Sequence, residues 1–141
     1  MRIAVIDGQG GGVGRSIIDR VRTQFGGSVS ILALGTNAVA TNLMLKAGAD
    51  EGASGENAII VNAPKVDVIV GCVAILSADS MLGEITSSMA AAIGSSPAMK
   101  ILIPLNRCGI EVVGLRGASL TDCIEDAIVT LKRFSFPSRP A

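Results

Sequence analysis

Hydrophobic residues in this chain form short unbroken runs that alternate with segments of helical periodicity. Unbroken apolar runs predict buried strands, and apolar residues spaced three and four positions apart predict amphipathic helices. The predicted strands are residues 2–6, 29–34, 66–70, 100–105 and 110–113. The predicted helices are residues 15–25, 36–47, 56–62, 86–94 and 120–131. The polar, glycine-containing stretch 49–55 is predicted to be a loop.

Strands and helices that alternate in this way indicate a parallel sheet covered by helices on both faces. We therefore predict an α/β fold, a three-layer doubly wound Rossmann-like arrangement with a mostly parallel sheet of about five strands. The sequence has neither a repeat nor a linker, so residues 1–134 are expected to form a single domain. Residues 135–141 contain two prolines and are expected to be a frayed tail.

Capping signals mark the ends of several predicted helices. Thr36 or Asn37 is a suitable N-cap for the second helix, and Gly48 is placed to follow its last turn. Ser119 and Asp122 have the spacing of a reciprocal capping pair at the start of the last helix.

The most informative segment is GQGGGVG, residues 8–14, between the first predicted strand and the first predicted helix. Glycine allows positive φ in a sharp turn and lets the backbone approach an anion closely. The N–H groups and the dipole at a helix start attract such an anion. We therefore predict that a phosphate-bearing ligand binds at Gly8, Gln9, Gly10, Gly11, Gly12, Val13 and Gly14. The alternatives are a turn that only connects strand to helix, and a site for a non-phosphate anion or a partner's carboxylate.

Gly8, Gly12 and Gly14 fit the spacing GxxxGxG, which resembles the nucleotide-binding fingerprint of the short-chain dehydrogenases/reductases. The resemblance covers about 35 residues, one βαβ unit, and implies NAD(P) or another nucleotide as cofactor. Two features depart from that family. Neither an acid nor an arginine follows the second predicted strand, where Gly35-Thr36-Asn37 stands, and the catalytic tyrosine is missing because the chain has no Tyr. We therefore expect a protein that binds a nucleotide without the chemistry of that family.

Taken whole, the chain also resembles a family of small bacterial proteins known only as a domain of unknown function. The strings that carry this resemblance span most of the chain and are RIAVIDGQGGGVG, ALGTNAVAT, GENAIIVN, SMLGEIT and ILIPLNRC. The resemblance implies a Rossmann-like fold and no established activity.

Three polar clusters are placed where loops should leave the carboxyl ends of strands, at residues 35–37, 77–84 and 106–108. In a doubly wound fold such loops converge on the glycine loop. Thr36 and Asn37 are therefore added to the predicted binding site. Asn106 and Arg107 are added as well, because a guanidinium holds a phosphate or carboxylate with two parallel hydrogen bonds.

The same clusters contain three candidates for a catalytic group. Asp79 and Glu84 are candidate general acids or bases, and Cys108 beside Arg107 is a candidate nucleophile with a lowered thiol pKa. Three residues of these clusters also have a purely structural interpretation: a helix cap for Asp79, a surface ion pair for Arg107 and a small buried side chain for Cys108.

Composition narrows the chemistry further. The 141 residues include no His, Tyr or Trp, which excludes histidine-dependent nucleophiles, imidazole metal ligands and a phenolic acid. The three cysteines are widely spaced, which favours neither a disulfide framework nor a metal site. Cys72 and Cys123 are predicted to be buried free thiols.

Charge and hydropathy restrict the partners. Twelve basic and twelve acidic residues are scattered, so the chain lacks the basic face of a nucleic-acid-binding protein. The longest apolar run, residues 68–76, is far shorter than the roughly 20 residues that span a membrane, and no signal-peptide pattern is visible. We therefore expect a cytoplasmic protein. A mean hydropathy of +0.56 with only 2% aromatic residues favours a homo-oligomer that covers apolar surface.

The leading hypothesis is thus a Rossmann-like protein that binds a nucleotide, dinucleotide or other phosphate-bearing ligand at residues 8–14. A second hypothesis is a non-catalytic oligomeric sensor or scaffold whose loop binds a metabolite or partner. A third is a small enzyme that uses Cys108 or Asp79 on a phosphorylated or acyl substrate.

Overall fold

The fold is built on one sheet of parallel strands. A computed structural model describes residues 1–105 and 109–135. Within them the strands have the order β3-β2-β1-β4-β5, and every neighbouring pair is parallel. The strands are β1 (Arg2–Asp7), β2 (Ser30–Gly35), β3 (Glu51–Ser54), β4 (Val68–Cys72) and β5 (Met99–Ile103). This is the strand order of a doubly wound Rossmann-like sheet, so the predicted fold class is confirmed.

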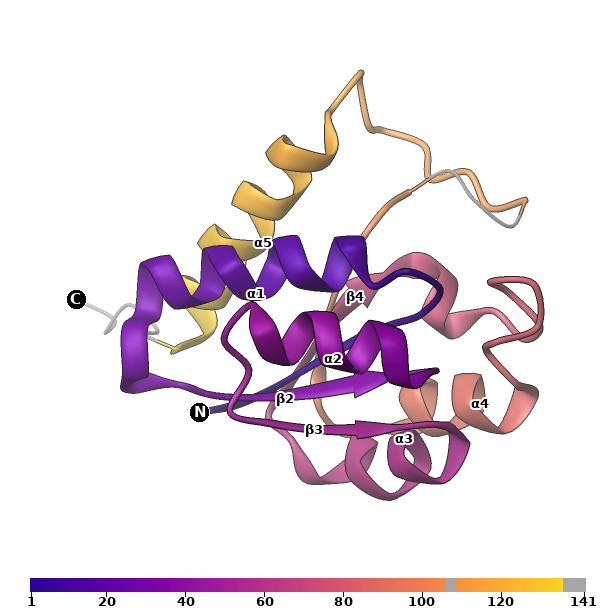
Figure 1. Ribbon diagram of the computed structural model, residues 1–141. Helices are drawn as coiled ribbons and strands as arrows, with labels where there is room; N and C mark the ends of the chain where they lie inside the picture. The colour runs from indigo at the N-terminus through magenta and orange to yellow at the C-terminus, as the bar shows by residue number, and fades with distance from the viewer. Residues whose placement is uncertain (106–108, 136–141) are drawn as a thin grey trace.

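Helices cover both faces of the sheet, which gives three layers (Figure 1). One face carries α1 (Gly12–Phe25), α2 (Ala38–Lys46) and α5 (Leu120–Ser135). The other face carries α3 (Glu56–Asn62) and α4 (Ser87–Ser95). Short 3₁₀ turns lie at η1 (Gly26–Ser28), η2 (Ala63–Lys65) and η3 (Val73–Leu76). None of the described helices is long and apolar enough to cross a membrane.

The central strand shows why its sequence is apolar at every position. Ile3 and Val5 pack into the cluster under α1 and α5, whereas Ala4 and Ile6 pack into the cluster under α3 and α4. Successive side chains of a strand point to opposite faces, and both faces are covered here. An unbroken apolar run is the consequence, and it ends at Asp7, where the strand reaches the carboxyl edge of the sheet.

Residues 49–55 were predicted to be a loop, and that prediction is wrong. β3 pairs with β2 at the edge of the sheet, in the register Leu32↔Glu51 and Gly35↔Ser54. Its sequence, EGAS, carries no apolar pattern because an edge strand needs little burial. Gly52 is needed for close packing, since a Cβ there would lie 2.9 Å from Thr41 Cγ2 on α2.

The prediction of a strand at residues 110–113 is also wrong. β5 ends the sheet, and residues 110–113 form no strand. The side chain of Val113 is 89% exposed. Strand propensity reflects packing against neighbouring strands, and this β-branched run has no such neighbour in the fold. Residues 109–119 instead lead away from the sheet to the first turn of α5 (Figure 1).

The predicted caps are confirmed. The Asn37 side chain accepts a hydrogen bond of 2.9 Å from the Ala40 N–H at the start of α2. Ser119 and Asp122 bond reciprocally: the Ser119 N–H donates to the Asp122 carboxylate at 3.2 Å, and the Asp122 N–H donates to Ser119 Oγ at 3.1 Å. Both helices therefore start where local sequence alone specifies.

Candidate functional site

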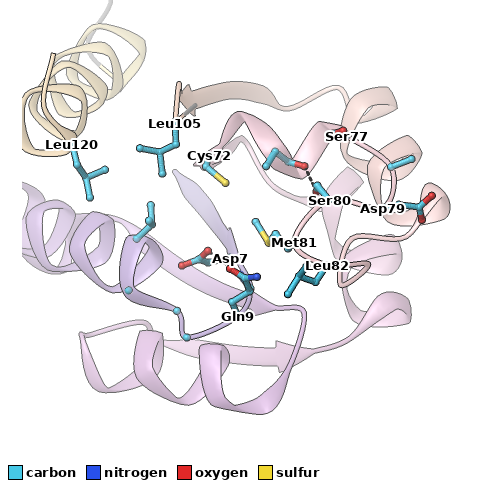
Figure 2. Close-up of a pocket in the computed structure, with 17 residues that line it drawn as sticks. Asp7, Gln9, Cys72, Ser77, Asp79, Ser80, Met81, Leu82, Leu105 and Leu120 are labelled. Atoms are coloured by element: carbon cyan, nitrogen blue, oxygen red, sulfur yellow. Dashed lines mark hydrogen bonds between the residues drawn. The ribbon is translucent and has the colours of Figure 1, made fainter. Parts of the chain in front are cut away.

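A cavity of about 940 Å³ opens at the carboxyl edge of the sheet, beside β1 and β4 (Figure 2). The chain leaves β1 toward β2 on one side and later returns to β4 on the other. In a doubly wound sheet this reversal leaves a crevice between the strand ends, and ligands bind there. Its described lining consists of residues 7–13, the segment 77–82 after β4, and Cys72, Ala74, Leu105 and Leu120.

Asp7 holds the glycine loop from within. It lies at the end of β1, is only 6% exposed, and accepts hydrogen bonds from the Gly8 N–H at 2.8 Å and the Gly14 N–H at 2.7 Å. Gly14 is in the first turn of α1, so this carboxylate stabilises the positive end of the helix dipole. Asp7 was absent from the predicted site. An acid immediately before a glycine loop and a helix start was the signal that could have found it.

The five glycines of the loop fall into two groups, according to whether the surrounding residues leave room for a side chain. Cβ atoms at Gly8, Gly11 and Gly14 would lie 2.6 Å from Thr36 Oγ1, 2.8 Å from Ala40 Cα and 2.5 Å from Met44 Sδ, respectively. Packing within the chain therefore requires glycine at these three positions. At Gly10 and Gly12, by contrast, a Cβ would meet nothing within 4 Å, and neither residue has a left-handed φ. Internal packing does not explain these two glycines, and both line the cavity.

The loop also contains backbone donors that no described residue accepts. The Gly11 N–H closes a tight turn onto the Gly8 carbonyl at 3.0 Å. The N–H groups of Gly10, Gly12 and Val13 have no acceptor among the described residues. Gly12 and Val13 belong to the first turn of α1, where N–H groups have no partner within the helix. These three amides are the donors that an anion in the cavity would meet.

The opposite wall is the segment 77–82, which turns with unusual backbone angles. Asp79, Met81 and Leu82 have φ values of 64°, 56° and 56°, a region that non-glycine residues rarely occupy. The buried Ser80 anchors this turn, because its hydroxyl donates to the Ala74 carbonyl at 2.6 Å. Leu82 is consequently 97% exposed beside the cavity. Backbone strain of this kind is concentrated at functional sites.

Glu84 connects the loops that follow β1, β2 and β4. Its Oε1 accepts hydrogen bonds from the Gln9 N–H at 2.9 Å, the Thr36 hydroxyl at 2.6 Å and the Asn37 side-chain amide at 2.7 Å. The convergence expected for residues 35–37 and 77–84 is therefore present, although Thr36, Asn37 and Glu84 do not line the cavity. The third predicted cluster, Asn106, Arg107 and Cys108, lies outside the described residues.

The titratable groups have different roles at this site. The hydrogen bond from Thr36 lowers the pKa of Glu84, which makes this side chain a stable anion and a poor proton donor near neutral pH. Burial raises the pKa of the Cys72 thiol at the cavity wall, so that thiol is a weak nucleophile. Asp79 lies on the cavity wall with an exposed side chain.

Two further predictions concern thiols and metals. Cys72 is a buried free thiol as predicted, whereas Cys123 is also free but only half-buried. Within the described part of the chain, no three His, Cys, Asp or Glu side chains lie close enough to hold a metal ion. None of the described residues that line the cavity is basic.

Comparisons with known proteins give a family and a distant structural likeness. A search of curated proteins finds no match. Among solved structures, the chain is similar to the dodecameric FMN-dependent Ubix-like decarboxylase from Escherichia coli O157:H7, at 15% identity and a TM-score of 0.45. That alignment covers 100% of this chain and 82% of the decarboxylase chain. The family described as a domain of unknown function, DUF3842, matches residues 2–135, and the chain belongs to this family.

Proposed function

We propose that this protein binds a small phosphate-bearing ligand of the nucleotide class in the cavity beside the glycine loop. The observation that carries the proposal is the pair Gly10 and Gly12, which the fold does not require and which leave open space over the cavity. A glycine costs backbone entropy on folding, so its presence without a packing reason needs another cause. Close approach of a ligand to the backbone is such a cause.

The phosphate is proposed to lie against the N–H groups of Gly10, Gly12 and Val13. The helix dipole of α1 favours a negative charge there. Asp7 already accepts the hydrogen bond of the Gly14 N–H, so this amide is not a donor for the phosphate. We propose that Arg107, with Asn106 beside it, also binds the phosphate. A guanidinium holds a phosphate with two parallel hydrogen bonds, and both residues follow the cavity residue Leu105 closely in the sequence.

The rest of the ligand is proposed to lie on apolar side chains. Met81 and Leu82 line one side of the cavity, and Leu105 and Leu120 line its far end (Figure 2). A few polar groups at one end of a mostly apolar cavity are typical of sites for small organic ligands, and so is a volume below about 1,000 Å³. A base or another flat ring fits this apolar part, and the phosphate fits the glycine loop.

A thermal-shift screen tests this proposal. The purified protein is heated with AMP, ATP, GTP, NAD, NADP, FMN, FAD or inorganic phosphate, and hits are measured by calorimetry. A ligand at 100 times its dissociation constant should add about 2.7 kcal/mol to the unfolding free energy. Gly12→Val should abolish the shift because its side chain fills the open space. Gly27→Ala, in the η1 turn that follows α1 and away from the cavity, is the control, since a Cβ there also meets nothing within 4 Å.

The outcomes separate clearly. A nucleotide that stabilises the wild type and the Gly27→Ala variant, but not the Gly12→Val variant, supports the proposal. If no compound in the screen stabilises the wild type, or if Gly12→Val binds as well as the wild type does, the proposal is wrong. Loss of binding in Arg107→Ala with an unchanged melting temperature would support the assignment of Arg107.

We also propose that the protein assembles with copies of itself. Several large apolar side chains are strongly exposed, including Leu82 at 97%, Val113 at 89%, Val39 at 69% and Val129 at 54%. Exposed apolar side chains of this kind are covered in many homo-oligomers. Sedimentation at micromolar concentration checks this, and a species of 14.3 kDa alone would contradict it.

A further inference from the structure

Glu84 closes one side of the glycine loop. Its carboxylate receives hydrogen bonds from Gln9, Thr36 and Asn37 on a single oxygen, and the Asn37 amide also donates to the Gln9 carbonyl at 3.0 Å. The parallel register pairs Asp7 with Gly35, so the residues after β1 and β2 are neighbours. Glu84 comes from the segment after β4 and reaches both. The space between the glycine loop and the end of β2 is therefore bridged by the charged side chain of Glu84.

The same space between the glycine loop and the end of β2 is also filled by side chains. A Cβ at Gly8 would lie 2.6 Å from Thr36 Oγ1, 2.7 Å from Met81 Sδ and 3.3 Å from Glu84 Oε1. The side chains of Thr36, Met81 and Glu84 thus pack directly on the Gly8 backbone. The cavity, by contrast, is lined by residues 7–13 and 77–82, and by no residue of 35–37. The glycine loop is thus open toward β4, and at Gly8 it is covered toward the end of β2, although Gly10 also borders a separate hollow along α2.

This asymmetry bears on the size of the ligand. In a doubly wound fold, a dinucleotide lies across the loop, and the ribose of its adenosine half is held by an acid at the end of the second strand. In this protein the donors at that place, Thr36 and Asn37, are occupied by Glu84. A ribose could enter only by displacing hydrogen bonds to a charged acceptor, which are stronger than neutral ones.

We infer that the site accepts a mononucleotide-sized ligand and excludes dinucleotides, and that Glu84 sets this limit. The inference rests on the proposed function, because it concerns a ligand in the same cavity. It assigns Glu84 a role in specificity in place of proton transfer. Glu84 is a positioning residue here: it makes no contact with the ligand and holds Thr36, Asn37 and Gln9 in the closed arrangement.

Two matched pairs of compounds test the inference, FMN against FAD and nicotinamide mononucleotide against NAD. In each pair the larger compound contains the smaller one joined to AMP. The wild type should bind one mononucleotide at least about tenfold more tightly than its dinucleotide, because displacing one hydrogen bond to a charged group costs about that factor. In Glu84→Ala the ratio should fall toward one, chiefly through tighter binding of the dinucleotide.

Two further variants control for the case in which Glu84→Ala loses its structure. Glu84→Gln keeps the volume and one oxygen acceptor but loses the charge, so it should lower the preference for the mononucleotide less than Glu84→Ala does. Thr36→Val removes the shortest of the three hydrogen bonds and keeps the side-chain size, so it should weaken the preference even if Glu84→Ala does not fold. Melting curves establish that each variant is folded before its affinity is compared.

The results distinguish this inference from the function on which it rests. Binding of neither member of either pair contradicts the proposed function itself. Equal binding of a mononucleotide and its dinucleotide by the wild type overturns the inference alone. The inference is also overturned if folded Glu84→Ala and Thr36→Val keep the full wild-type preference.

Discussion

The two kinds of glycine in the loop should respond oppositely to the same substitution. In Gly14→Ala the new Cβ lies 2.5 Å from Met44 Sδ and 2.9 Å from Asp7 Cβ. Met44 is fully buried and Asp7 accepts the Gly14 hydrogen bond, so neither neighbour can withdraw freely. Overpacking of this kind costs about 1–3 kcal/mol, and better helix propensity returns up to about 1 kcal/mol. We expect Gly14→Ala to be destabilised by about 1–2 kcal/mol.

Gly12→Ala should be slightly more stable than the wild type. A Cβ there meets nothing, and alanine reduces the entropy of the unfolded chain. The expected gain is about 0.5–1 kcal/mol. Both residues are in the first turn of α1, so each variant is the control for the other. The two variants should therefore differ by about 2 kcal/mol, which is roughly 6 °C in melting temperature for a chain of this length.

Urea unfolding followed by far-UV circular dichroism measures this difference. The absence of Trp and Tyr removes the usual fluorescence signal. All variants are compared at one protein concentration, because assembly would add to stability. Met44→Ala supplies a double-mutant cycle: it should cost less in the Gly14→Ala background, with a coupling of about 1 kcal/mol or more. Equal stability of Gly12→Ala and Gly14→Ala, or zero coupling with Met44, would refute the division of the glycines.

Two other predictions concern side chains that join separate elements. Arg22 donates to the carbonyls of Gly48 at 2.7 Å, Gly26 at 2.9 Å and Val29 at 3.0 Å and pairs with Asp50, so Arg22→Met should cost about 2–4 kcal/mol in urea unfolding. A loss below about 0.5 kcal/mol, the range of a simple surface substitution, would contradict this role. Glu84 has a pKa below its ordinary value of 4.5, chiefly because Thr36 donates to it. A folded-state pKa that is lowered stabilises the protein above the unfolded-state pKa, and this stabilisation is lost as the pH falls through the folded-state pKa. The difference in unfolding free energy between the wild type and Glu84→Gln should thus be constant near pH 7 and shrink below about pH 4.5; a pH-independent difference would disagree.

Local sequence determined the buried strands and the amphipathic helices, because their signals are carried by residues close together in the chain. Ile3 to Ile6 are apolar at every position because both faces of β1 are covered. Asn37 and the pair Ser119 and Asp122 cap helices through bonds three residues apart. The class of fold follows from such local patterns, and so does the location of the glycine loop.

Only the tertiary structure decided which of these patterns became strands at the edge of the sheet. The polar segment Glu51–Ser54 is a strand because β2 offers it unpaired backbone groups. Residues 110–113 have the more favourable composition but no strand to pair with. Edge strands depend on a partner that is distant in sequence, and local propensity carries no information about that partner.

The candidate site was likewise predictable from the sequence in part. The sequence alone indicated that residues 8–14 form a helix-start loop, and it correctly predicted that residues 35–37 and 77–84 converge on that loop. It could not reveal that Gly8 and Gly14 are glycines for packing whereas Gly10 and Gly12 face open space, because the neighbours are Thr36, Met81 and Met44. Nor could it reveal that Glu84 bonds to Gln9, a residue 75 positions away. These contacts arise because parallel strands bring their carboxyl ends to one edge, whatever their separation along the chain.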